Sequence, residues 1–97
     1  MPGYLIANLD VRDAALYEEY RQKVPALIAR HGGKYLVRGG ALDVREGSLP
    51  LKRLVVLEFP TLEAARRFYD SADYAPLKTM RIAATNSDVI LAEGYTG

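Results

Sequence analysis

The sequence predicts an α+β protein with the ferredoxin-like order βαββαβ, in which a four-stranded antiparallel sheet carries its helices on one face. Stretches with strand-type and helix-type spacing of apolar residues alternate along the chain in that order. The chain has 97 residues, of which 49% are apolar, and this suits one globular domain spanning residues 1–97. No repeat of fixed period and no low-complexity tract interrupts it.

The first half of the chain is predicted to form a strand, a long helix and a second strand. Residues 4–9 have the β-branched and aromatic content of a buried strand. Asp10 or Asp13 could cap the helix that follows. From Asp13, apolar residues recur at helical spacing, and we expect Pro25 to kink this helix without ending it. Gly32 can take the left-handed conformation that closes a helix, and residues 34–38 then form the second strand.

The second strand is short and lies between two glycine pairs. Strict alternation places Tyr35 and Val37 on one of its faces and Leu36 and Arg38 on the other. Residues 39–52 follow as a long connection that could be mobile or could form a lip over a pocket.

The second half of the chain repeats the order strand, helix, strand with one additional helical segment. Its strand is apolar on both faces apart from Glu58, which favours a central position in the sheet. The additional segment carries Arg81 on an otherwise apolar stripe, which is unusual. The predicted elements are a strand at 53–59, a helix capped by Thr61, a helical segment from Ser71 or Asp73, a turn at Asn86-Ser87 and a strand at 88–93.

The predicted strands are apolar on both faces, and helices on one face cannot cover both. In the first strand, for example, Leu5 and Ala7 alternate with Tyr4 and Ile6. An antiparallel sheet with one solvated face normally alternates apolar and polar residues. We therefore expect a second copy of the chain to cover the other face, sheet against sheet and with two-fold symmetry.

Composition and charge argue against several classes of function. The 13 Lys and Arg residues nearly balance the 12 Asp and Glu residues, so the basic surface of a nucleic-acid-binding protein is missing. The sequence has no cysteine and one histidine, and no spacing matches a metal or cofactor motif, so neither a metal nor a cofactor is predicted. No apolar run could span a membrane and no signal peptide is evident, which makes a cytoplasmic location the default expectation.

Short elements distributed over nearly the whole chain share the order and spacing of one known family. They are Asp13-x-x-x-Tyr17-x-x-Tyr20, His31-Gly32-Gly33-x-Tyr35-Leu36-Val37-Arg38-Gly39-Gly40, Glu46-Gly47, the run Arg53 to Pro60, Phe68-Tyr69-x-Ser71-x-x-Tyr74, Arg81 and Glu93-Gly94. Together they resemble the DUF1330 family of the dimeric α/β-barrel superfamily. The resemblance implies a ferredoxin-like protomer and a homodimer whose two sheets face one another as a dimeric α/β barrel. It implies no particular reaction, since the superfamily includes small monooxygenases, isomerases, haem-degrading enzymes and proteins without known activity.

His31 is the only imidazole and the predicted catalytic residue. It falls on the inward stripe of the first helix if that helix continues past Pro25, and an imidazole there could act as a general base near neutral pH. The alternative is a helix-terminal residue that interacts with the last carbonyl groups.

Two arginines are predicted to bind a ligand. Arg38 either holds a carboxylate in a forked geometry or pairs with Glu46 or Glu58 inside the protein. Arg81 either binds an anion or lays a long stem over the core with its head group in water.

Three uncharged polar residues complete the predicted ligand-binding set. Tyr69 and Tyr74 offer hydroxyl groups to a ligand, or are simply aromatic residues of the core. Asn8 is either a polar group of the pocket or one half of a buried hydrogen-bonded pair.

Two functions of different class follow from these residues. The first is a pocket for a modest anionic or aromatic compound, and its reaction, if it catalyses one, is proton transfer as in an isomerase or cofactor-independent oxygenation. His31 would then be the base and an arginine would hold the developing oxyanion. The second is a dimeric binding or scaffolding module without turnover. Carboxylate partners for both arginines and no cavity beside His31 would favour this second function.

Overall fold

The computed structural model describes residues 1–96, and its elements follow the predicted order. They form an α+β fold with ferredoxin-like topology, which confirms the predicted fold class. The elements are β1 (Gly3–Val11), α1 (Ala14–Arg30), β2 (Lys34–Arg38), β3 (Leu54–Phe59), α2 (Leu62–Asp70), α3 (Ala75–Ala84) and β4 (Thr85–Glu93).

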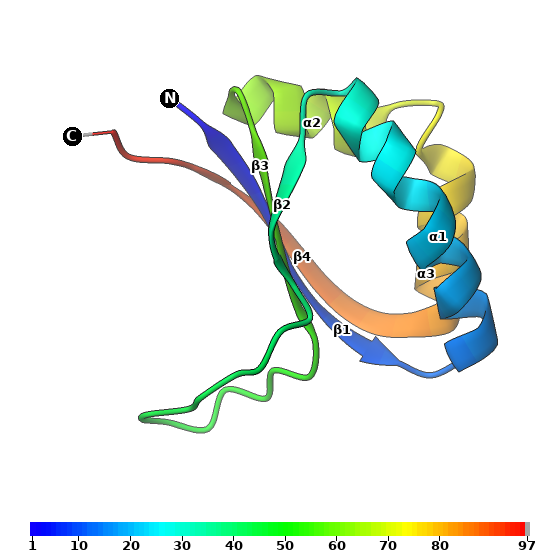
Figure 1. Ribbon diagram of the computed structural model, residues 1–97, viewed down its shortest axis with the longest axis vertical. Helices are drawn as coiled ribbons and strands as arrows, with labels where there is room; N and C mark the ends of the chain where they lie inside the picture. Colours follow the sequence, from blue (N-terminus) through cyan, green and yellow to red (C-terminus); the bar gives the residue numbers. More distant parts are fainter. Residues whose placement is uncertain (97) are drawn as a thin grey trace.

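The four strands form one antiparallel sheet in the order β2-β3-β1-β4. Because β3 lies between β2 and β1, the central position predicted from its apolar run is confirmed. The three helices gather on one face of the sheet, and the connection between β2 and β3 projects away from both layers (Figure 1). The described chain places no helix or strand on the opposite face.

Capping residues and a glycine explain where the helices begin and end. Asp13 and Thr61 cap α1 and α2, each accepting a hydrogen bond of 3.0 Å from the backbone amide three residues later. α1 continues through Pro25 to Arg30, and Gly32 follows with a φ of +81°, a conformation that favours glycine. None of the helices in the described part of the chain is long and apolar enough to cross a membrane.

The core lies between the helices and the sheet. Phe59 of β3 and Phe68 of α2 are each 1% exposed, with ring centroids 5.4 Å apart. A Cβ atom on Gly33 would lie 2.7 Å from the Phe59 ring, so only glycine lets the chain pass this close. Burying each large apolar side chain contributes about 1.5–3 kcal/mol. The buried apolar residues are Leu5, Ala7, Leu9, Tyr17, Tyr20, Val24, Leu27, Ile28, Val55, Leu57, Phe59, Ala65, Phe68, Tyr74 and Ala84.

β4 begins at Thr85, so the turn predicted at Asn86-Ser87 is wrong. The backbone of Thr85 is extended, so α3 ends at Ala84 and β4 begins at the next residue. The Thr85 hydroxyl donates a 2.8 Å hydrogen bond to the Arg81 carbonyl in the last turn of α3. The early start pairs β4 with β1 along its whole length and places Ser87 opposite Leu9 on the helix-facing side of the sheet.

The strict alternation predicted for β2 is also wrong. Tyr35 pairs with Leu57 and Arg38 pairs with Val55, so three steps along β2 match two steps along β3. Leu36 lies within this irregularity, which has the residue count of a β-bulge. Since Leu57 and Val55 both face the helices, the bulge brings Arg38 to the same face as Tyr35.

The sheet face away from the helices carries apolar side chains. Ile90 is 58% exposed and Leu36 is 48% exposed, both large values for aliphatic residues. Lys34 and Glu58 form an ion pair of 3.3 Å on the same face. Among the described residues, Tyr4, Ile6, Leu54 and Val56 are the half-buried central members of this apolar face.

Candidate functional site

A cavity of about 40 Å³ lies between the sheet and the helices. A buried water needs roughly 10–15 Å³, so the cavity holds only a few waters unless side chains at its mouth move. Its walls are mostly aliphatic and aromatic. The described residues that line it are Leu5, Ala7, Leu9, Tyr17, Tyr20, Arg21, Val24, Ile28, Tyr35, Arg38, Val55, Leu57, Phe68, Tyr69, Tyr74, Arg81 and Val89.

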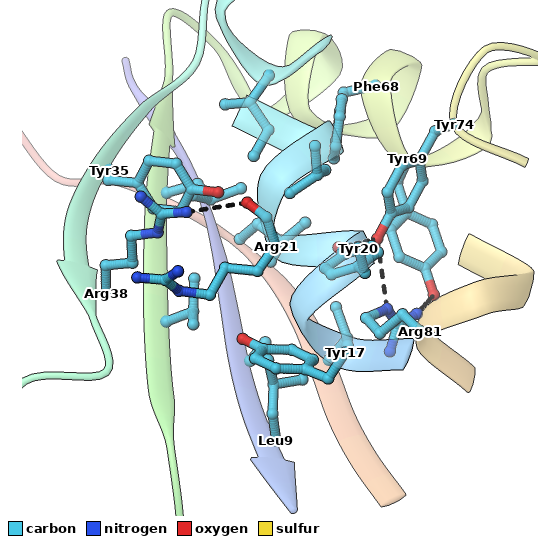
Figure 2. Close-up of a pocket in the computed structure, with 17 residues that line it drawn as sticks. Leu9, Tyr17, Tyr20, Arg21, Tyr35, Arg38, Phe68, Tyr69, Tyr74 and Arg81 are labelled. Carbon is cyan, nitrogen blue, oxygen red and sulfur yellow. Dashed lines mark hydrogen bonds between the residues drawn. The ribbon is translucent and has the colours of Figure 1, made fainter. Parts of the chain in front are cut away.

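Arg81 supplies a positive charge at the inner end of the cavity. Arg81 is only 4% exposed. Nε donates to the Tyr74 hydroxyl and Nη2 to the Tyr69 hydroxyl, both at 3.3 Å, and Nη1 donates to the Ser87 hydroxyl. Figure 2 shows the guanidinium beside Tyr69 and Tyr74. The group is therefore held in a fixed position by neutral oxygen atoms from α2, the segment before α3 and β4.

The salt bridges within residues 1–96 do not include Arg81. A buried charge is normally paired, because moving an ion out of water carries a large free-energy penalty. The guanidinium also has more N–H donors than its three hydroxyl contacts use. The cavity thus presents a positive charge that an anionic group could neutralise.

Tyr20 and Tyr74 extend this polar cluster. Their hydroxyl oxygens lie 2.8 Å apart. Burial, followed by the neighbouring Tyr74, raises the pKa of Tyr20 above its ordinary value, so the phenol stays neutral. Burial by itself would lower the pKa of Arg81, but Tyr74, Tyr20 and Tyr69 outweigh it and raise that pKa. The cluster is therefore a charged guanidinium surrounded by neutral phenols.

Arg38 lies at the mouth of the cavity and is exposed. Its Nη2 donates to the backbone carbonyl of Arg21 at 3.0 Å. Its guanidinium carbon lies 4.6 Å from the centroid of the Tyr35 ring, a cation–π distance. Figure 2 shows these three residues together, on the other side of the cavity from Arg81.

The two carboxylates considered as partners of Arg38 do not pair with it in the described chain. Glu58 instead pairs with Lys34 on the open face of the sheet. The second arginine at the mouth, Arg21, does have a carboxylate partner, Glu18 at 3.2 Å. Arg38 therefore carries an uncompensated charge at the mouth, as Arg81 does at the inner end.

His31 lies at the end of α1, where it is the C-cap residue. Its backbone N–H donates to the Leu27 and Ile28 carbonyls at 3.2 and 3.1 Å. Its ring meets the Phe68 ring edge-on at 5.6 Å, and Phe68, not His31, is among the described residues that line the cavity. The structure thus separates His31 from both arginines, and its catalytic role stays a prediction.

Asn8 lies on the open face of the sheet, away from the cavity. Its Oδ1 accepts a hydrogen bond of 2.8 Å from the Lys52 amide, and its Nδ2 donates to the Pro50 carbonyl at 3.3 Å. These contacts tie the connection between β2 and β3 to the sheet. Of the predicted ligand-binding residues, Arg38, Tyr69, Tyr74 and Arg81 share the cavity and Asn8 does not.

Sequence reasoning missed several polar residues of the site. Helical spacing alone places Tyr17 and Tyr20 on the apolar stripe of α1, and the sequence pattern places Ser87 in a turn. The available signal was the repeated choice of tyrosine over phenylalanine on a buried stripe, because a buried phenol needs a hydrogen-bond partner. Tyr17 has one in Arg53, whose Nε donates to its hydroxyl at 2.9 Å.

The polar groups of the lining are phenols and guanidiniums. Within residues 1–96, no group of three or more His, Asp or Glu side chains is placed to hold a metal ion. Neither a carboxylate nor an imidazole is among the described lining residues. The arrangement can therefore bind and polarise an anionic group, but it offers no side chain whose ordinary pKa makes it a base at neutral pH.

The fold and the cavity define a ferredoxin-like α+β protein with an internal site lined by tyrosines and arginines. The chain belongs to the DUF1330 family, a domain of unknown function, whose family model matches residues 2–95. This match confirms the resemblance found in the sequence. None of the curated proteins compared with the chain matches its sequence.

Solved structures share the fold at low sequence identity. RPA0582, a protein of unknown function from Rhodopseudomonas palustris, aligns over 99% of this chain and 84% of its own, with a TM-score of 0.78 and 18% identity. A point mutant of SnoaB, a cofactor-independent oxygenase from Streptomyces nogalater, aligns over 99% of this chain and 95% of its own, with a TM-score of 0.70 and 18% identity. A second SnoaB structure aligns over the same shares with a TM-score of 0.64 and 20% identity.

Proposed function

We propose that the cavity binds a small organic compound with an acidic or enolisable group, and that Arg81 is the charge partner of that group. One observation carries the proposal: a guanidinium that is 4% exposed faces an apolar cavity and contacts neutral hydroxyls instead of a carboxylate. Tyr69 and Tyr74 orient the guanidinium and are close enough to share the ligand. The aliphatic and aromatic walls suit an apolar ligand body. Since 40 Å³ holds only a few waters, such a body enters when side chains at the mouth, including the exposed Arg38, move outward.

A positive charge in apolar surroundings lowers the pKa of a hydroxyl placed next to it, and it stabilises the resulting anion. Isomerisation of an enolisable compound and its cofactor-independent oxygenation both pass through such an anion. The fold shared with SnoaB, described as a cofactor-independent oxygenase, supports this class of chemistry. A ligand whose acidic hydroxyl releases its proton to solvent water and stays ionised beside Arg81 needs no imidazole in the cavity, so the position of His31 does not oppose the proposal.

The test is calorimetric titration with benzoate and the fatty acids from butanoate to decanoate, each compared with its neutral amide. We expect the acids to bind at least about tenfold more tightly than the amides, because a charge-assisted hydrogen bond adds roughly 1.5–3 kcal/mol. Tyr69→Phe should weaken the acids selectively, and Tyr95→Phe, at an 87% exposed position, is the matched control. Equal affinity for acids and amides, or no binding of any acid, would overturn the proposal.

A non-catalytic binding module is the second candidate. The described lining contains no carboxylate or imidazole to act as a general base, which favours binding without turnover. The two candidates differ in the fate of an enolisable ligand that binds. Consumption of dissolved oxygen or isomerisation of the ligand, measured with an oxygen electrode and by NMR, identifies the enzyme, whereas recovery of unchanged ligand identifies the binding module.

We also propose that the protein is a homodimer in which a second copy covers the open face of the sheet. Apolar side chains on that face, including the exposed Ile90 and Leu36, support this arrangement, because water would otherwise solvate them. An isologous contact between two such faces follows from two-fold symmetry. The cytoplasmic location expected from the sequence stays a prediction.

Light scattering tests the dimer directly. The expected mass is twice the 10.7 kDa of one chain. Ile90→Glu on the open face should dissociate the dimer, and Ile82→Glu on α3 is a matched control, since the two isoleucines are 58% and 59% exposed. A monomeric wild-type protein, or equal behaviour of the two variants, would contradict the proposal.

A further inference from the structure

The cavity has two guanidinium groups for which the described chain supplies no carboxylate. Arg81 reaches it from α3 at the inner end, and Arg38 reaches it from β2 at the mouth. Figure 2 shows the two side chains on opposite sides of the apolar lining. Arg21, the third arginine there, is already paired with Glu18.

Arg38 has hydrogen-bond donors that a ligand could use. A single hydrogen bond, to the Arg21 carbonyl, holds it within the described chain, and the Tyr35 ring supports one face of its guanidinium. This leaves other N–H groups of the fork available to a carboxylate. The bulge at Leu36 matters here, since it turns Arg38 toward the cavity instead of the open face of the sheet.

From this arrangement we infer that the ligand carries acidic groups at both ends of an apolar body, one bound by Arg81 and the other by Arg38. The inference rests on the proposed function, because it adds a second anionic group to the ligand that Arg81 binds. A ligand with one acidic group, bound by Arg81, leaves Arg38 at the mouth without a carboxylate partner in the described chain. A dianion neutralises both charges and keeps its apolar middle against the aliphatic and aromatic walls.

The contribution of the second group is set by the position of Arg38. Because Arg38 is exposed, its charge is partly screened, and we expect a gain of up to about fivefold in affinity from the second group. The gain should also depend on ligand length, since both acids can be bound only when the chain spans the distance between the two guanidiniums.

The experiment is calorimetric titration with succinate, adipate, suberate and sebacate, each compared with the monocarboxylate of the same chain length. We expect one or two adjacent lengths to show the dicarboxylate up to about fivefold tighter than its monocarboxylate. Arg38→Gln should abolish that difference by weakening the dicarboxylates more than the monocarboxylates. Arg66→Gln, a change at an exposed arginine of α2, is the matched control.

The outcomes separate this inference from the proposed function. If monocarboxylates bind and no dicarboxylate binds more tightly, the second anionic group is refuted and the role of Arg81 stands. If Arg38→Gln keeps the preference for dicarboxylates, the assignment to Arg38 is refuted. If neither series binds, the proposed function itself fails and this inference fails with it.

Discussion

The two arginines of the cavity are held in opposite ways. Arg81 is 4% exposed and bonded to three hydroxyl groups, whereas Arg38 is exposed and has one carbonyl and one aromatic ring as partners. The difference indicates that Arg81 is part of the folded core as well as of the candidate site, while Arg38 belongs to the candidate site alone. Changes at the inner end should therefore alter both stability and binding, and changes at the mouth should alter binding only.

Arg81→Met is the most severe test of this comparison. We expect acid binding to weaken by about 100-fold, since a buried charge-assisted contact worth up to roughly 3 kcal/mol is removed. The hydroxyls of Tyr69, Tyr74 and Ser87 also lose their donor, while the desolvation penalty of the buried charge is relieved, so the free energy of unfolding should fall by at most about 1–3 kcal/mol. Calorimetry and urea denaturation measure the two effects.

Arg81→Lys provides the control for charge. It keeps a cation but not the forked donors, so it should recover part of the acid affinity and little of the hydroxyl network. An Arg81→Met protein that binds acids as tightly as the wild type would contradict the role of Arg81 as the buried charge partner of the ligand.

Tyr74→Phe should have the next largest effect. The Tyr74 hydroxyl contacts both Arg81 and Tyr20, at 3.3 and 2.8 Å, whereas the Tyr69 hydroxyl contacts Arg81. We expect urea denaturation to show a loss of about 1–3 kcal/mol for Tyr74→Phe and about 1 kcal/mol for Tyr69→Phe. Equal losses, or no difference from the control Tyr95→Phe, would show that the cluster is not a connected network.

Alkaline pH tests the inner end without removing the arginine. The pKa of Tyr20 is raised in the folded protein above the ordinary 10.0 of the unfolded chain, chiefly by burial. The unfolded state therefore loses its proton first, and stability should fall as pH rises above about 10, by up to about 1.4 kcal/mol per pH unit for this group.

The comparison variant for the pH experiment is Tyr20→Phe. It should reduce the alkaline slope of the unfolding free energy, measured by urea denaturation across the pH range. The pKa of Tyr35 is also raised by burial, so the slope should shrink without vanishing. A slope unchanged from the wild type would contradict the burial of a neutral Tyr20 phenol.

Most of the fold could be predicted because it depends on local patterns. The caps at Asp13 and Thr61, the glycine at position 32 and the central strand β3 are each signalled by neighbouring residues. The start of β4 was missed because Thr85 ends α3 and begins a strand at once, without the Gly or Pro that usually marks such a change.

The candidate site was predicted only in part, because it depends on pairing between distant segments. A single extra residue in β2 decides that Arg38 faces the cavity, and sequence alternation gives the opposite answer. His31 and Arg81 both lie on apolar stripes, yet one caps a helix and the other lies within the cavity, depending on which neighbours the tertiary fold supplies. Asn8 shows the same limit, since its partners are 42 and 44 residues away.

The smallest expected effect is that of Arg38→Gln on stability. An exposed side chain with one hydrogen bond to a carbonyl contributes little net free energy, so urea denaturation should give a value within about 0.5 kcal/mol of the wild type. The Tyr35 ring keeps its place through its own packing against the core, not through the guanidinium. A loss as large as that of Tyr74→Phe would mean that the mouth is part of the structural core too, and that the contrast between the two arginines lies in exposure alone.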